Sequence, residues 1–215
     1  MSKRGYSGNL AGTALMLILG FAVVPSAYAA TVADLQTGWD TANFQLTGKE
    51  QHESFEQLIE AADAFTAANP DDADGWVWSG IIKSSFAGIK GGLGALGLAK
   101  QAKADFEQSL ELDANAMHGS AYTSLGTLYA GVPGWPLGFG DDDKAEQFLL
   151  QGLALDPTGI DSNYFYAQFL REQDRSEEAR KYYAAGLLAP PRPDRAIADS
   201  GRQAELRAAL SELDE

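Results

Sequence analysis

The amino-acid sequence predicts an all-helical protein in which pairs of helices stack in a row. Three observations predict this fold class. Positions recur along the chain at a spacing of 34 residues, apolar residues within each copy follow every three or four positions, and prolines close three of the copies. Apolar residues at that period indicate amphipathic helices, and a fixed repeat of this length is typical of a solenoid built from helix pairs.

The repeated positions are clearest towards the C-terminus. Five of them recur with a displacement of 34 residues: Ala145, Leu149, Gly152, Leu153 and Pro157 return as Ala179, Tyr183, Gly186, Leu187 and Pro191. Two weaker copies lie upstream, one with Ala102, Phe106, Ser109 and Leu110, and an earlier one with Leu58, Ala62, Phe65 and Pro70. Each copy predicts the second helix of a pair. In three copies a proline ends that helix, because proline has no backbone N–H and disfavours a helical residue before it.

The first helices of the pairs have a matching pattern. The best copy follows W-x2-L-G-x2-Y with tyrosine in place of tryptophan, through Tyr122, Leu125, Gly126 and Tyr129. Looser copies contain Trp76 with Gly80, and Asn163, Tyr166, Ala167 and Leu170. A small residue in the middle of each copy lets two helices approach closely, while the large residues beside it fill the space between neighbouring pairs.

This unit resembles the tetratricopeptide repeat (TPR), a helix-turn-helix of 34 residues, over roughly residues 39 to 191. The resemblance implies an all-α, right-handed superhelix of about four repeats plus a C-terminal capping helix. The repeats are expected at about 39–72, 73–116, 119–159 and 160–193, and the cap at 194–213. A polar outer face on a terminal helix is what repeat arrays require for solubility.

A subfamily is indicated by the run from Gly131 to Ala145, followed by Pro157 and the segment 163–166. It is similar to exported bacterial proteins related to the T component of TRAP transporters. That similarity implies a periplasmic protein that associates with the transporter's solute-binding protein, or with itself to form an apolar channel. The chain departs from the pattern in one respect: T components are typically lipoproteins, and this sequence has no cysteine to lipidate.

The first 29 residues predict a cleaved signal peptide, followed by a single domain over 30–215. Lys3 and Arg4 precede an apolar stretch from Leu10 to Val24, and small residues lead up to cleavage after Ala29. An uncleaved membrane anchor is the alternative, but the apolar stretch is shorter than the roughly 20 residues that span a bilayer. Export predicts a periplasmic location without a stable membrane anchor.

Composition excludes several classes of function. The formal charge is -14, and it becomes -16 once Lys3 and Arg4 are removed with the signal peptide. So acidic a chain repels nucleic-acid phosphates. The absence of cysteine excludes thiol catalysis, disulfides and cysteine-ligated metals, and only His52 and His118 could supply imidazole.

Two insertions interrupt the repeat spacing. One contains Gly88, Gly91, Gly92, Gly94 and Gly97, and it is expected to form an extended, mobile end to a helix. The other is the loop 131–143, which is rich in proline and glycine and carries two aromatic residues.

Three motifs could carry chemistry, and each has a plainer structural interpretation. The run 92–97 matches G-x-G-x-x-G, but the segment before it is predicted to be helical, whereas a dinucleotide site needs a strand there. The acidic run 141–143 lacks the calcium-loop pattern and predicts a helix cap. His118 lies near Ser120 and Ser124, but neither serine lies in a nucleophile elbow. We therefore expect no catalytic residue, cofactor or metal.

The aromatic residues divide into two groups. Those at repeat packing positions are expected in the core: Trp76, Tyr122, Tyr129, Tyr166 and Tyr183. Those off the pattern are expected to face a ligand or partner: Trp78, Trp135, Phe139 and Tyr164. The inner wall of the stack should consist of the residue after each leading packing position and the residue four later. These are Asn43, Thr47, Val77, Ile81, Thr123, Thr127, Tyr164 and Gln168, which together predict a mildly polar, uncharged groove for a ligand or peptide.

Binding rather than chemistry is the predicted function. The leading expectation is a periplasmic adaptor for a protein partner, with a TRAP solute-binding protein suggested by the resemblance. The alternative is a carrier of a small apolar ligand enclosed by the glycine-rich insertion and the 131–143 loop. A hydrolase is the third and weakest alternative.

Overall fold

The computed structural model describes residue 1 and residues 30–214, so the predicted signal peptide lies outside the described residues. The described chain is α-helical and contains no named strand. In chain order the α-helices are α1 Val32–Phe44, α2 Gly48–Ala68, α3 Ala73–Lys90, α4 Gly92–Leu112, α5 Ser120–Gly131, α6 Asp142–Leu155, α7 Ile160–Glu172, α8 Ser176–Leu187 and α9 Ala196–Glu212. Short 3-10 helices precede two of them, at Ala116–Gly119 and Pro193–Arg195.

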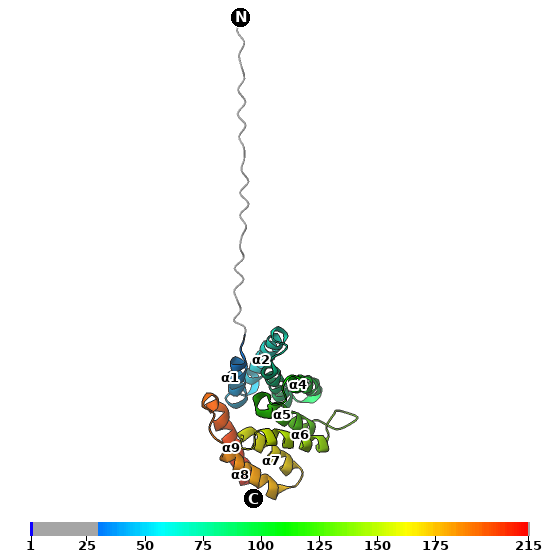
Figure 1. Cartoon of the computed structure of the whole chain (residues 1–215), viewed down its shortest axis with the longest axis vertical. Coiled ribbons are helices and arrows are strands. Elements are labelled where there is room, and N and C mark those ends of the chain that lie inside the picture. The colour runs from blue at the N-terminus through cyan, green and yellow to red at the C-terminus, as the bar shows by residue number, and fades with distance from the viewer. Residues whose placement is uncertain (2–29, 215) are drawn as a thin grey trace.

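The helices form consecutive pairs, α1 with α2 up to α7 with α8, that stack into a curved array (Figure 1). This confirms the predicted all-α architecture of stacked helix pairs with a C-terminal helix. The first helix begins at Val32, seven residues before the predicted start at Trp39, because Thr31 caps it: the threonine hydroxyl accepts from the Asp34 N–H, and the Asp34 carboxylate accepts from the Thr31 N–H.

The small residues of the repeat lie where two helices come closest, as predicted. A Cβ at Gly126 would approach the Ala145 carbonyl oxygen to 2.9 Å, and one at Gly80 would meet the Phe106 ring at 2.4 Å. Ala167 is fully buried. At Gly126 and Gly80 the backbone of one helix therefore lies directly against the next helix. A larger residue would prevent this close approach.

Two neighbouring tryptophans differ from the prediction in how deeply they are buried. Trp78, expected to face a ligand or partner, is 1% exposed and belongs to the N-terminal core with Trp39 and Phe86. Trp76, expected in the core, is only half-buried, and its indole N–H donates to the Pro70 carbonyl. In this repeat Trp78 is therefore the tryptophan that packs inward, while Gly80 keeps its predicted close contact.

The other aromatic residues at packing positions follow the prediction more closely. Tyr129, Tyr166 and Tyr183 are buried, and Tyr122 is half-buried against Phe148. The repeat pattern therefore identifies the packing face correctly in the C-terminal half of the chain.

The glycine-rich insertion is helical and continues α3 beyond the repeat, as expected. It lengthens α3 and α4, and only Gly91 separates them, with φ 62° and ψ -177°. That conformation is open almost only to glycine, so a single residue reverses the chain between two long helices. The run 92–97 accordingly begins a helix that follows another helix, not a strand.

An ion cluster fixes α3 within the N-terminal half. The buried Lys83 ammonium lies 2.7 Å from Asp105 of α4 and 2.8 Å from Asp63 of α2, and the Ser79 hydroxyl donates to the same Asp105 oxygen. Burial alone would favour a neutral lysine, but hydrogen bonds to the two carboxylates outweigh it and raise the pKa of Lys83. Three helices are thereby held in one register.

The C-terminal helix does more than cap the array. It packs on α7 and α8 and also returns to α1, beside which it lies in Figure 1. Gly201 sits against the Phe44 ring, and Arg195, just before α9, pairs with the buried Asp40 of α1. The last helix thus meets the first, and the two ends of the array enclose the space between them. None of the described helices combines the length and apolar character that crossing a membrane requires.

Candidate functional site

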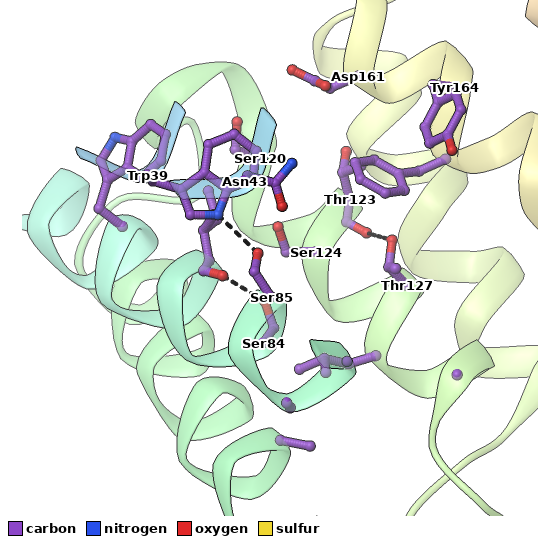
Figure 2. A pocket seen from close by; sticks show the side chains of 18 of the residues that line it. Trp39, Asn43, Ser84, Ser85, Ser120, Thr123, Ser124, Thr127, Asp161 and Tyr164 are labelled. Carbon is purple, nitrogen blue, oxygen red and sulfur yellow. Dashed lines mark hydrogen bonds between the residues drawn. The ribbon is translucent and has the colours of Figure 1, made fainter. Parts of the chain in front are cut away.

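A cavity of about 930 Å³ lies on the inner side of the array. Its wall comes from α1, α3, α4, α5, α7 and α9, together with the 3-10 segments and the loop after α5. Along the length of α5 the wall changes character: ionic side chains surround its N-terminal end, hydroxyls its middle and apolar residues its C-terminal end. Figure 2 shows part of this wall, including the hydroxyl-bearing side chains of α3 and α5.

The ionic end is a network of three arginines from the C-terminal segment. Arg202 donates to Asp161 at 2.8 Å, and Arg192 donates to the other oxygen of Asp161 at 2.7 Å. Arg192 also donates to Asp199 at 2.7 Å, and Arg195 pairs with Asp40. Burial would raise the pKa of Asp161, but the positive charges of Arg202 and Arg192 outweigh it and hold that pKa well below its usual value.

Two of these arginines cover aromatic rings. Arg195 lies 5.0 Å from the centre of the Trp78 ring and 5.6 Å from that of Trp39, and Arg202 lies 4.3 Å from that of Tyr164. These are cation–π distances. Each of these guanidinium groups therefore forms an ion pair and also stacks on an aromatic ring.

The middle of the cavity carries a belt of polar side chains that we call the hydroxyl belt. It comprises Asn43 of α1, Ser84 and Ser85 of α3, and Ser120, Ser124 and Thr127 of α5. Several of these groups bond to the protein itself: Ser84 donates to Ile81 O, Ser120 to Met117 O and Thr127 to Thr123 O, while Ser85 accepts from the Trp39 indole at 2.9 Å.

The far end of the cavity is apolar. It is open because small residues line much of its wall. It lies where α3 ends and α4 begins, and the loop after α5 borders it. The residues are Ala87, Gly88, Gly92, Ala95, Leu96, Ala99, Leu128, Val132, Pro133 and Leu137.

The structure brings six of the eleven predicted site residues to the cavity wall. They are Asn43, Trp78, Ile81, Thr123, Thr127 and Tyr164. The other five lie elsewhere. Thr47 is an exposed residue before α2, Val77 is in the core, and Gln168 donates to the Tyr164 hydroxyl. Trp135 and Phe139 lie in the loop after α5.

That loop, residues 132–140, has a constrained backbone and an exposed tip. Gly140 donates to the Pro133 carbonyl at 3.0 Å, and a Cβ at Gly140 would collide with the Val132 carbonyl oxygen. Phe139 folds back onto Tyr129 with ring centres 5.4 Å apart. Trp135 and Leu137 are 90% and 73% exposed, and Leu137 also borders the cavity. The loop therefore exposes two large apolar side chains on a backbone that is held by internal contacts.

The predicted groove was wrong in one respect: it is not uncharged. The ionic end consists of Asp161 of α7 and arginines that follow the last repeat, and no repeat position indicates the arginines. Two serines of α3, Ser84 and Ser85, were also missed, although their signal was present. Ser84 and Ser85 follow Ile81 by three and four residues and so share its helix face. Extending the predicted inner face by one turn would have found them.

The other candidate motifs have structural roles. The Asp141 side chain caps α6 by accepting from Lys144 N at 3.1 Å, and Asp72 caps α3 by accepting from Gly75 N at 2.9 Å. His118, Ser120 and Ser124 all border the cavity, and the Ser120 hydroxyl donates to the Met117 carbonyl rather than to His118. Within the described residues, no three acidic or imidazole groups gather closely enough to hold a metal.

Fold and cavity together define a TPR-like helical solenoid with a central binding space. No protein-family model matches the chain, and no curated protein matches it. Among solved structures, it is similar to a thermophilic TPR protein from Thermus thermophilus. The TM-score is 0.56 over 83% of this chain and 89% of that one, at 18% sequence identity. At this identity the likeness establishes the fold.

Proposed function

We propose that this protein is an exported, periplasmic carrier that holds a small apolar molecule in its central cavity. The observation that supports this function is the cavity itself. Its volume of about 930 Å³ lies at the upper end of the range of roughly 300–1,000 Å³ that ligand sites occupy. An apolar wall with a few convergent polar groups is typical of such sites.

The return of α9 to α1 favours a small molecule over a long peptide. A peptide lying along the inner surface of a solenoid needs a groove that is open at both ends. Here the pair between Arg195 and Asp40 and the contact between Gly201 and Phe44 join the two ends of the array across one end of that groove.

The test is a search for the ligand and for a dye that replaces it. We expect organic extraction of the protein purified from the bacterial envelope, followed by mass spectrometry, to release one apolar metabolite in stoichiometric amount. We also expect the extracted protein to bind the uncharged probe N-phenyl-1-naphthylamine with a rise in fluorescence.

A cavity-filling variant locates the binding. Ala95 lies in the cavity wall, whereas Ala104 is an exposed residue of the same helix. Ala95→Trp should reduce probe binding at least tenfold, and Ala104→Trp should leave it unchanged. Absence of both a metabolite and probe binding in the wild-type protein would overturn the proposal.

A second function, docking on a protein partner, is favoured by the exposed Trp135 and Leu137. Exposed large apolar side chains on a constrained loop are typical of interaction surfaces. The sequence resemblance makes a TRAP solute-binding protein the first partner to test. Crosslinking in intact cells should capture it with the wild-type protein and not with Trp135→Ala. Because the contact would be apolar, its affinity should change little between low and high salt.

A further inference from the structure

The structure also indicates the chemical class of the ligand, on the basis of the proposed carrier function. The deciding observation is that the charged side chains of the ionic end already pair with one another. Three guanidinium groups, of Arg192, Arg195 and Arg202, face four carboxylates, of Asp40, Asp161, Asp199 and Glu205. Each arginine pairs with at least one carboxylate, so the carboxylates outnumber the guanidinium groups by one.

Every guanidinium group at this end already lies at ion-pair distance from a carboxylate, so an anionic ligand would have to compete for it. To bind an arginine it would have to displace a carboxylate that is attached to the same chain and already in place. Arg202 illustrates the difficulty, because it is 5% exposed, donates to Asp161 and Glu205, and stacks on Tyr164. The overall charge of -14 adds a repulsive field for anions.

The hydroxyl belt, by contrast, keeps hydrogen-bonding capacity for an uncharged group. Figure 2 shows Asn43 and Ser124 beside the same space, with no hydrogen bond drawn from either to the other side chains displayed. Asn43 offers an amide donor and a carbonyl acceptor, and Ser124 a hydroxyl. The oxygens of Ser84 and Ser120 donate to backbone carbonyls and can still accept.

The apolar end supplies room for a hydrocarbon body but no polar partner. Its small residues, such as Ala95 and Ala99, border open volume instead of filling it. Burying apolar ligand surface there favours binding.

We infer that the ligand is a neutral amphiphile whose hydrocarbon chain occupies the apolar end and whose uncharged hydroxyl or carbonyl group binds the hydroxyl belt at Asn43 and Ser124. Long-chain alcohols, amides and esters belong to this class, and free fatty acids do not.

The test compares two ligands of equal chain length, dodecan-1-ol and dodecanoate, as competitors of N-phenyl-1-naphthylamine at neutral pH. Dodecan-1-ol should displace the probe at a concentration at least tenfold lower than dodecanoate. Because an alcohol is also the more apolar of the two, variants must assign the preference to named groups.

Two variants do this. Asn43→Leu combined with Ser124→Ala should weaken dodecan-1-ol at least fivefold while leaving the probe, which lacks a hydroxyl, within twofold. Glu205→Gln removes one carboxylate from Arg202 and should strengthen dodecanoate several-fold without changing dodecan-1-ol. Circular dichroism of each variant checks that the fold is retained.

The outcomes separate the inference from the carrier function. If the probe binds but dodecanoate competes as well as dodecan-1-ol, and Arg202→Met abolishes that competition, the ligand is an anion and the inference is wrong. If Asn43→Leu with Ser124→Ala leaves dodecan-1-ol binding unchanged, the hydroxyl belt does not recognise the ligand. Failure of the wild-type protein to bind the probe overturns the carrier function itself.

Discussion

The two ends of the cavity are built differently. At the ionic end, side chains from α1, α7 and the C-terminal segment meet, and the pair between Asp40 and Arg195 joins residues 155 positions apart. At the apolar end, the wall comes from the turn between α3 and α4 and from the loop after α5, which belong to two successive helix pairs.

This difference indicates which end holds the array closed and which end a ligand enters. Separating α9 from α1 would leave the buried Asp40 without its guanidinium partner. The apolar end depends on a one-residue turn at Gly91 and on a loop whose tip is exposed. We therefore expect a ligand to enter the cavity through its apolar end. The following variants test the difference between the two ends, in order of decreasing expected effect on stability.

The largest effect is expected from removing the guanidinium group that joins the C-terminal segment to α1. Arg195→Leu leaves the carboxylate of Asp40, which is 3% exposed, without a partner. An unpaired buried charge typically costs about 3 kcal/mol, so the free energy of unfolding should fall by about that amount in urea denaturation. Arg207→Leu is the matched control, because Arg207 is exposed and contacts only Gln203. Equal losses in the two variants would show that the ion pair between Arg195 and Asp40 does not hold the C-terminal segment against α1.

A smaller loss, about 2 kcal/mol at neutral pH, is expected from Asp161→Asn, since hydrogen bonds to two charged arginines are weakened. The arginines lower the pKa of Asp161 in the folded protein, so its stabilising contribution is complete above the unfolded value of about 4 and is lost as the pH falls below it. The difference in unfolding free energy between wild type and variant should therefore shrink on acidification. A constant difference from neutral to acidic pH would contradict this assignment.

At the apolar end, two glycines should respond in opposite directions. Gly91→Ala forces a side chain into a conformation with φ 62° and ψ -177°, which should cost about 1.5 kcal/mol although nothing lies within 4 Å of the new Cβ. Gly88→Ala places alanine inside α3 with the same open surroundings and should stabilise by up to about 1 kcal/mol. Thermal unfolding followed by circular dichroism measures both. The same sign in both variants would contradict the one-residue turn.

The smallest effect on stability is expected for Trp135→Ala. Its side chain is 90% exposed, so the unfolding free energy should change by less than about 0.5 kcal/mol and the helical signal should persist. Partner capture should nevertheless be lost if the loop is the docking surface. A large loss of helix would instead assign Trp135 to the core.

Much of the fold could be predicted from local patterns. The positions of Gly126, Ala145 and Leu149 gave the closest helix contact, and Asp141 gave a helix start, because each depends on residues within one helix pair. The burial of Trp78 in place of Trp76 could not be read from the repeat spacing. That spacing favoured Trp76, and only the packing of Trp78 in one cluster with Trp39 and Phe86 decides which tryptophan is buried.

The sequence by itself determined the helix pairs, their close packing and several residues of the inner wall, since periodicity, small residues and prolines act over distances shorter than one repeat. Only the tertiary structure decided that the surface becomes a cavity with an ionic end. That outcome depends on Arg195 reaching Asp40 and on Arg202 reaching Asp161, and no local rule relates side chains so far apart in the chain.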